Sequence, residues 1–137
     1  MRILGHPVHV MVIHFPIALW PAHWVLHVLS TMLPPGALFV AFWLLVAGTA
    51  FGWLAALAGV LDLMELFRGS DVAAQRAGLY HAAINGLVVA AFTALALWEY
   101  ASYPATRSSA PMLIAEAVVI AAMFVGNFFG GKMVWGH

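Results

Sequence analysis

Four long apolar stretches restrict what this chain can fold into more than any other feature of the sequence. They cover about residues 8–32, 37–67, 78–100 and 112–130. An α-helix needs roughly 20 mainly apolar residues to cross a bilayer. Only 7% of the 137 residues are charged, whereas about a quarter is usual in soluble domains. The sequence therefore predicts an all-α membrane protein with a single domain, a four-transmembrane-helix bundle.

The charge balance and the absence of cysteine exclude several classes of function. Five Lys+Arg residues balance five Asp+Glu residues, so the chain lacks the basic surface that nucleic-acid binding requires. Without cysteine it can form no disulfide, no thiolate metal site and no covalent haem attachment. The motifs G-x-S-x-G and H-E-x-x-H of hydrolases are also missing. Any metal or haem must be held by histidine, methionine or oxygen ligands.

The positive charges near the ends of the spans predict the orientation. Most of them belong to the side that also carries the two termini, and Arg107 belongs to the other side. Those on the terminal side are Arg2, Arg68, Arg76 and Lys132. Because positively charged short loops stay in the cytoplasm, we expect both termini on the cytoplasmic side of a bacterial inner membrane.

Small residues recur at helical spacing on three of the spans. They are Gly48, Gly52 and Ala56, then Gly78, Ala82, Gly86 and Ala90, then Gly126 and Gly130. In lipid, such faces let helix backbones approach closely. We expect them to pack a compact bundle, although they could equally serve a homo-oligomer or a larger complex.

The seven histidines are the main indication of function. Five of them belong to the predicted cytoplasmic side and come from three separate segments: His6, His9, His14, His81 and His137. At 1.5 Å per residue, His14 and His81 lie at similar depths. Ionisable residues within a span usually face the bundle interior and mark function. Asp62 and Glu65 lie at the same level, and Asn85, one turn beyond His81, could orient it.

Proline in the first span bears on the geometry of this site. Pro16 and Pro21 each remove a backbone hydrogen bond. Pro16 leaves the carbonyl of Val12 unpaired beside His14, so a kink there could re-aim the histidine-bearing turn. The alternative is that prolines are simply tolerated in membrane helices.

His23 and His27 form a second pair, four residues apart on one helix face and nearer the outer side. Such a pair can bind one small metal ion, but it cannot supply the two opposite axial ligands of one haem. The preferred interpretation is structural, with hydrogen bonds between helices alongside Trp20 and Trp24. Glu116 is likewise interpreted as structural, pairing with Arg107 or reaching the interface.

Several segments resemble a known bacterial family. They are Gly5-His6-Pro7-Val8-His9, Val12-Ile13-His14-Phe15-Pro16-Ile17-Ala18, Gly59-Val60-Leu61-Asp62, His81-Ala82-Ala83-Ile84-Asn85 and Gly130-Gly131-Lys132-Met133-Val134. The pattern resembles domain-of-unknown-function family 2231, with its H-P-x-H-P-x-x-V-H-F-P-I start; Val10-Met11 stands where the second proline would be. The resemblance implies four membrane helices and no settled activity. The residues that match its motifs are His6, His9, His14, Asp62, His81 and Asn85.

Haem b with electron transfer is the first functional hypothesis. It needs two imidazoles from different helices at equal depth, and His14 with His81 is the best pair. His9 could replace His14, while His6 and His137 could serve a second haem. Arg76 and the other cations of that side could hold the propionates. The haem would exchange electrons with quinone or a redox partner protein.

Two other hypotheses stay open. The same five histidines, with Asp62 or Glu65, could form a transition-metal site for zinc, copper or iron. Alternatively, the chain is a non-catalytic membrane subunit, or its polar residues form a proton relay. Because almost the whole chain lies in the membrane, we expect an electron carrier or subunit of a larger complex rather than a self-contained enzyme.

Overall fold

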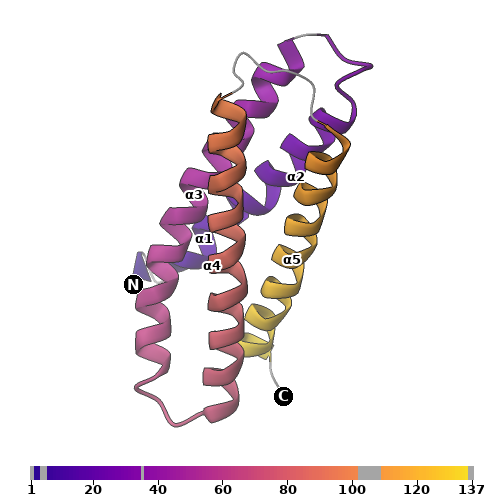
Figure 1. Ribbon diagram of the computed structural model, residues 1–137. Helices are drawn as coiled ribbons and strands as arrows, with labels where there is room; N and C mark the ends of the chain where they lie inside the picture. The colour runs from indigo at the N-terminus through magenta and orange to yellow at the C-terminus, as the bar shows by residue number, and fades with distance from the viewer. Residues whose placement is uncertain (1, 4–5, 35, 102–108, 136–137) are drawn as a thin grey trace.

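The computed structural model describes residues 2–3, 6–34, 36–101 and 109–135 (Figure 1). Two short strands, β1 (Arg2–Ile3) and β2 (His6–Pro7), pair antiparallel at the start of the chain. They are followed by α1 (Val8–Val12), α2 (His14–Val28), α3 (Gly36–Leu66), α4 (Val72–Ala101) and α5 (Ala110–Trp135).

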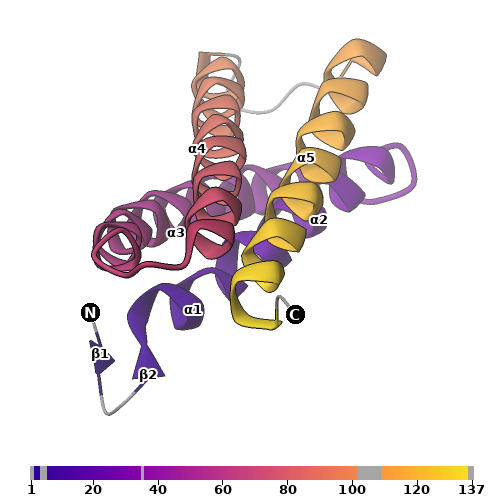
Figure 2. The same ribbon diagram turned by 90° about the horizontal axis from the view of Figure 1, so that it is seen from below.

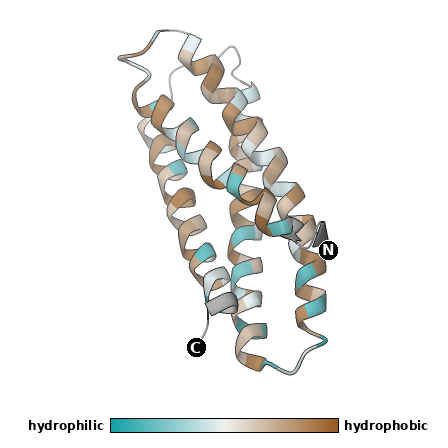
Figure 3. Ribbon diagram, turned by 180° about the vertical axis from the view of Figure 1, so that it is seen from behind, coloured by the Kyte–Doolittle hydropathy of each residue, from teal (hydrophilic) through white to brown (hydrophobic). Residues whose placement is uncertain are grey.

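Four helical segments in the described part of the chain are long and apolar enough to cross a membrane. They are His9–Val28, Gly36–Leu66, Val72–Ala101 and Ala110–Lys132. Hydrophobic residues line these helices along their length (Figure 3). Many large apolar side chains are exposed, as expected of a surface that faces lipid. The Leu87 side chain, for example, is 73% exposed. The predicted four-helix membrane bundle is confirmed; the cytoplasmic side of the termini stays a prediction.

The first apolar segment is divided and shorter than predicted. A break at Ile13 separates α1 from α2, in the turn before Pro16, whose ring leaves the carbonyl of Val12 without its helical donor. The helix ends at Val28 rather than near residue 32. The break is confined to one residue, because Ile13 keeps helical dihedral angles and its N–H donates to the carbonyl of His9 at 3.0 Å.

The third span begins earlier than predicted, at Val72 rather than near residue 78. Asp71 caps it, because its Oδ1 accepts a hydrogen bond from the backbone N–H of Ala74 at 2.9 Å. This polar first turn extends α4 beyond the apolar stretch. α5 likewise extends beyond the predicted residue 130, to Trp135.

The helices form a closed bundle in which α2 packs on α3, α3 on α4, α4 on α5, and α5 back on α2 (Figures 1 and 2). α1 lies against α3. Trp20 is at the centre of the core and stacks on Phe92, with ring centroids 4.1 Å apart. Leu45, Val88, Val89 and Met123 are buried in the same cluster.

Two glycines of α3 make room for the Trp20 indole. A Cβ at Gly48 would lie 2.8 Å from Trp20 Cδ1, and one at Gly52 would lie 3.0 Å from Trp20 Cη2. The indole Nε1 donates to Thr49 Oγ1 at 3.4 Å. The small face of this span therefore receives a large aromatic side chain, and the hydroxyl beside it partners the indole nitrogen.

We predict that Trp20→Ala destabilises the bundle strongly, because it leaves a cavity where the indole contacts α3 and α4. Truncation of a buried Phe or Trp typically costs about 3–5 kcal/mol. Thermal unfolding of the purified protein in detergent would measure the loss. Leu87→Ala is the control, since that side chain is 73% exposed. Equal unfolding temperatures for the two variants would contradict the assignment of Trp20 to the core.

Candidate functional site

Polar side chains inside the bundle gather in two places near opposite ends. One is the wall of a cavity, here called the His9–His81 cavity, between α1, α2, α3, α4 and α5. The other is the His/Glu cluster, formed by His23, His27, Glu99 and Glu116. The first lies toward the α3–α4 turn and the second toward the opposite end, since residues 99 and 116 flank the α4–α5 connection (Figure 1).

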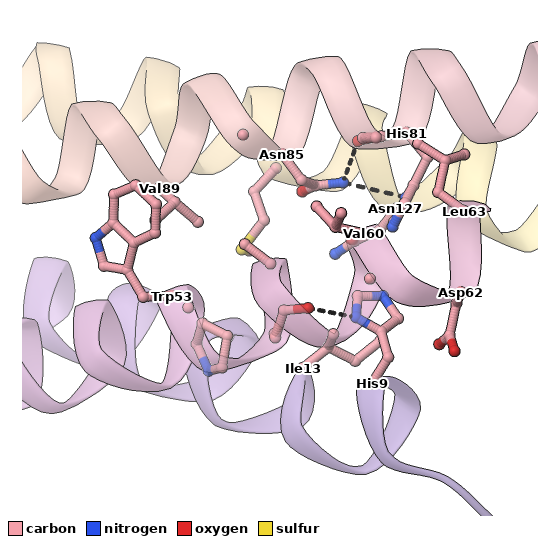
Figure 4. A pocket seen from close by; sticks show the side chains of 18 of the residues that line it. His9, Ile13, Trp53, Val60, Asp62, Leu63, His81, Asn85, Val89 and Asn127 are labelled. Atoms are coloured by element: carbon pink, nitrogen blue, oxygen red, sulfur yellow. Dashed lines mark hydrogen bonds between the residues drawn. The ribbon is translucent and has the colours of Figure 1, made fainter. Parts of the chain in front are cut away.

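The His9–His81 cavity has a volume of about 480 Å³ and mainly apolar walls. Its polar lining comprises His9, Asp62, His81, Asn85 and Asn127 (Figure 4). Its small lining residues include Gly52, Gly59, Ala82 and Gly86. Cofactor sites typically have volumes of about 300–1,000 Å³, with apolar walls and a few placed polar groups. The cavity has the size and composition of such a site.

His9 and His81 approach each other across this cavity from α1 and α4. Their ring centroids are 5.8 Å apart and the rings are nearly perpendicular, at 88°. His9 Nδ1 lies 2.8 Å from the carbonyl oxygen of Ala55 on α3. His81 Nδ1 lies 2.9 Å from the carbonyl oxygen of Gly126 on α5.

These carbonyl contacts decide how each imidazole is protonated. A carbonyl oxygen only accepts hydrogen bonds, so each Nδ1 carries the hydrogen and donates it. In the neutral imidazole, Nε2 then keeps its lone pair. Metal-binding histidines characteristically donate their second ring N–H to a carbonyl or a carboxylate in this way. Both rings are thus fixed in the tautomer that can ligate through Nε2.

Asn85 supports His81 from the next turn of α4. Its Nδ2 donates to the backbone carbonyl of His81 at 3.1 Å and lies 3.1 Å from His81 Nδ1 (Figure 4). Because His81 Nδ1 donates to Gly126, it cannot also accept a hydrogen bond from the Asn85 amide, and the expected role of Asn85 in orienting the His81 ring stays a prediction.

Three glycines make room for these polar side chains. A Cβ at Gly59 would lie 3.0 Å from His9 Cε1. A Cβ at Gly126 would lie 2.5 Å from Asn85 Nδ2, and a Cβ at Gly130 would lie 2.7 Å from His81 Nδ1. The expectation was that Gly126 and Gly130 serve close helix packing. The structure agrees with that expectation, since α4 packs on α5 at both positions, and it adds that each glycine accommodates a polar side chain of the site.

The small face of α4 borders the cavity. Gly78, Ala82 and Gly86 line the cavity, and a Cβ at Gly86 would meet nothing within 4 Å. This part of α4 therefore leaves open space beside Gly86, while Gly78 is buried.

The structure does not bring His14 opposite His81 as expected. The α1–α2 residues that line the cavity are His9, Ile13, Pro16, Ile17 and Trp20, which share one helix face. His14 falls off that face and is exposed. His9, which the sequence offered as the substitute, takes the place opposite His81.

The other predicted site residues lie away from the cavity or beyond what the structure describes. Arg76 is exposed and lines a separate hollow with Tyr80, Phe129 and Lys132. Glu65 is exposed. His6 is placed only through its backbone, in β2, and His137 lies outside the described residues. Of the five histidines expected to converge, the structure therefore shows two together.

The His/Glu cluster was largely missed by sequence reasoning. His23 and His27 of α2 meet Glu99 of α4 and Glu116 of α5, and one ligand atom from each residue lies within 4.8 Å of all the others. Such a cluster could hold a metal ion. The expectation that Glu116 reaches the interface is wrong, because Glu116 is fully buried against His23. The alternative partner, Arg107, lies outside the described residues, so that pairing stays a prediction. Glu99 was not considered, although an acid at the end of a span is the signal that could have indicated it.

Comparisons with known proteins agree with the membrane architecture. The profile of the family described as "Predicted membrane protein (DUF2231)" matches residues 5–137. No curated protein and no solved structure matches the chain significantly. The function must therefore be argued from the two polar sites themselves.

We predict that Gly130→Ala destabilises the protein because the new methyl group contacts His81, 2.7 Å away. Overpacking of this kind typically costs about 1–3 kcal/mol. Gly131→Ala is the matched control, since a Cβ there would meet nothing within 4 Å. Thermal unfolding in detergent would compare them.

The same pair of substitutions in a His81→Ala background isolates the contact. We expect the cost of Gly130→Ala to disappear there. An undiminished cost would show that the methyl group conflicts with something other than the His81 ring.

Proposed function

The chain belongs to domain-of-unknown-function family 2231, a family of predicted membrane proteins, and we propose that it is a membrane electron carrier that binds a b-type haem in the His9–His81 cavity. The observation that carries the proposal is the approach of two imidazoles from different helices across an apolar cavity. A haem held between helices takes one axial imidazole from each side.

The hydrogen bonds of the two rings support ligation through Nε2. Each Nδ1 is committed to a backbone carbonyl, that of Ala55 for His9 and that of Gly126 for His81. Such bonds fix ring orientation and raise the basicity of the ligating nitrogen. His9 and His81 would therefore hold the haem iron through Nε2, and Asn85 would position His81.

The shape of the cavity also favours a flat macrocycle. Gly52, Gly59, Ala82 and Gly86 all line it, so little side-chain bulk occupies the space between the helices. The apolar walls would keep water away from the bound group. The polar residues Asp62, Asn127 and Asn85 lie toward one part of the wall (Figure 4).

Two histidine ligands from the protein suit a haem that transfers electrons. When bound, a haem with two protein imidazoles supplies one-electron redox chemistry without an open position for substrate. The four spans take up most of the chain, so its electrons would be exchanged with quinone or a redox partner protein at the membrane of a bacterial cell.

We predict that the purified protein, expressed with ample haem supply, shows a Soret band and, after dithionite reduction, sharp α and β bands. His9→Ala or His81→Ala should remove the bands, because each deletes an axial ligand. His14→Ala should keep them, since His14 is exposed and off the cavity face. His14 is the matched control, being a histidine of the same segment.

A featureless spectrum of well-folded wild-type protein would contradict the haem proposal. A chromophore that survives His81→Ala but is lost in His14→Ala would move the site away from the cavity.

A small-metal site made from the histidines expected near the termini has less support. Within the described part of the chain, only His9 and His81 of that set come together, and the group of metal-binding residues found there lies elsewhere. Metal analysis of the same sample would distinguish the haem site from the small-metal site. Iron in proportion to the Soret band supports haem. A colourless sample whose metal is lost in His81→Ala would support the small-metal alternative.

A further inference from the structure

We propose that the His/Glu cluster at the other end of the bundle is a second cofactor site, which binds one divalent transition-metal ion of the Zn²⁺, Fe²⁺ or Mn²⁺ type and ties α2, α4 and α5 together. This site is independent of the haem proposal. It uses none of the residues of the His9–His81 cavity.

The distances within the cluster fit one small ion. Metal–nitrogen and metal–oxygen bonds of about 2.0–2.2 Å place neighbouring ligands of a tetrahedral ion about 3.3–3.6 Å apart. His23 Nε2 lies 3.4 Å from Glu99 Oε1 and 3.3 Å from Glu116 Oε1. His27 Nδ1 lies 3.7 Å and 3.5 Å from the same two oxygens. Four of the six ligand–ligand distances are thus close to those of a tetrahedral site.

The hydrogen bond of His23 Nδ1 indicates that the cluster needs a positive charge. His23 Nδ1 lies 2.9 Å from the carbonyl oxygen of Ala41 and must donate its hydrogen to it. Neutral His23 therefore directs the lone pair of Nε2 at two carboxylate oxygens. Acceptors that face each other at these distances need either a proton or a cation between them.

Burial makes this requirement stronger. His23 and Glu116 are fully buried, at 0% exposed, and the Glu99 side chain is 10% exposed. Two carboxylates at this depth are costly unless they are neutralised. Arg68, Arg76 and Lys132 are the basic side chains that the structure describes, and they lie at the opposite end of the bundle (Figure 1). A divalent ion would balance the charge of both carboxylates.

Two buried carboxylate oxygens supply an independent sign of a missing ligand. Glu99 Oε1 and Glu116 Oε2 are shielded from solvent and accept no hydrogen bond from any of the residues that the structure describes. Buried polar atoms nearly always have a partner, and each exception points to strain, an unplaced water or an ion. Glu99 Oε1 is among the four atoms that would surround the metal.

The ligand set favours a structural role. His23 and His27 lie one turn apart on α2, so both rings reach the same point, and the carboxylates come from two other helices. Four protein ligands close the coordination sphere of a tetrahedral ion and leave no position for substrate. Imidazole and carboxylate together suit zinc, iron and manganese.

The test is metal analysis and thermal unfolding of protein purified without a histidine tag. After removal of bound metal with a chelator, Zn²⁺, Mn²⁺ or anaerobic Fe²⁺ is added back. We expect about one equivalent of non-haem metal per chain and a rise of several degrees in the unfolding midpoint. Glu116→Gln and Glu99→Gln should lose the metal and the rise, since the amide keeps the volume of the side chain but is a poor ligand.

Glu65→Gln is the matched control, because Glu65 is an exposed acid outside the cluster. It should bind metal as the wild type does. The measurement is repeated in a His81→Ala background, which separates this metal from haem iron. Wild-type protein that binds no metal and shows no shift with any of the three ions would overturn the proposal and identify the cluster as a proton-sharing ion pair.

Discussion

Ring nitrogens that donate to backbone carbonyls of neighbouring helices are the interaction on which this bundle depends. His9 donates to Ala55, His23 to Ala41, and Trp24 to Leu113, and His81 does the same toward α5. Lipid offers such groups no alternative partner. It also provides no hydrophobic force between helices. Each of these bonds therefore joins two helices and at the same time fixes the orientation of a ring.

The same constraint explains why the polar residues gather in two places. A polar side chain that faces lipid is costly, so the polar residues within the spans collect where several helices can satisfy them. Glycine is part of this solution. Gly59 and Gly130 provide the room for His9 and His81, so residues that resemble helix-packing motifs in sequence serve the polar sites. The core around Trp20 separates the two sites and holds the helices at the spacing that both require.

Much of the architecture and part of the cavity site could be predicted from periodicity and depth. The number of spans follows from apolar length, and His81 with Asn85 could be placed one turn apart on one helix. The choice between His9 and His14 could not be predicted, because it depends on which face of the first span turns toward the other helices. Glu99 and Glu116 are 17 residues apart across a connection, so their meeting with His23 depends on the packing of α2 against α4 and α5.

The sequence by itself determined that this chain is a membrane protein with four spanning helices, and that histidine is prominent among the polar residues of those spans. Those properties depend on composition and on length along one helix, which local physics controls. The tertiary structure decided which histidines meet, which glycines give them room, and that two acids join His23 and His27. These outcomes depend on the rotation of each helix about its axis, and that rotation is set by contacts between segments far apart in the chain.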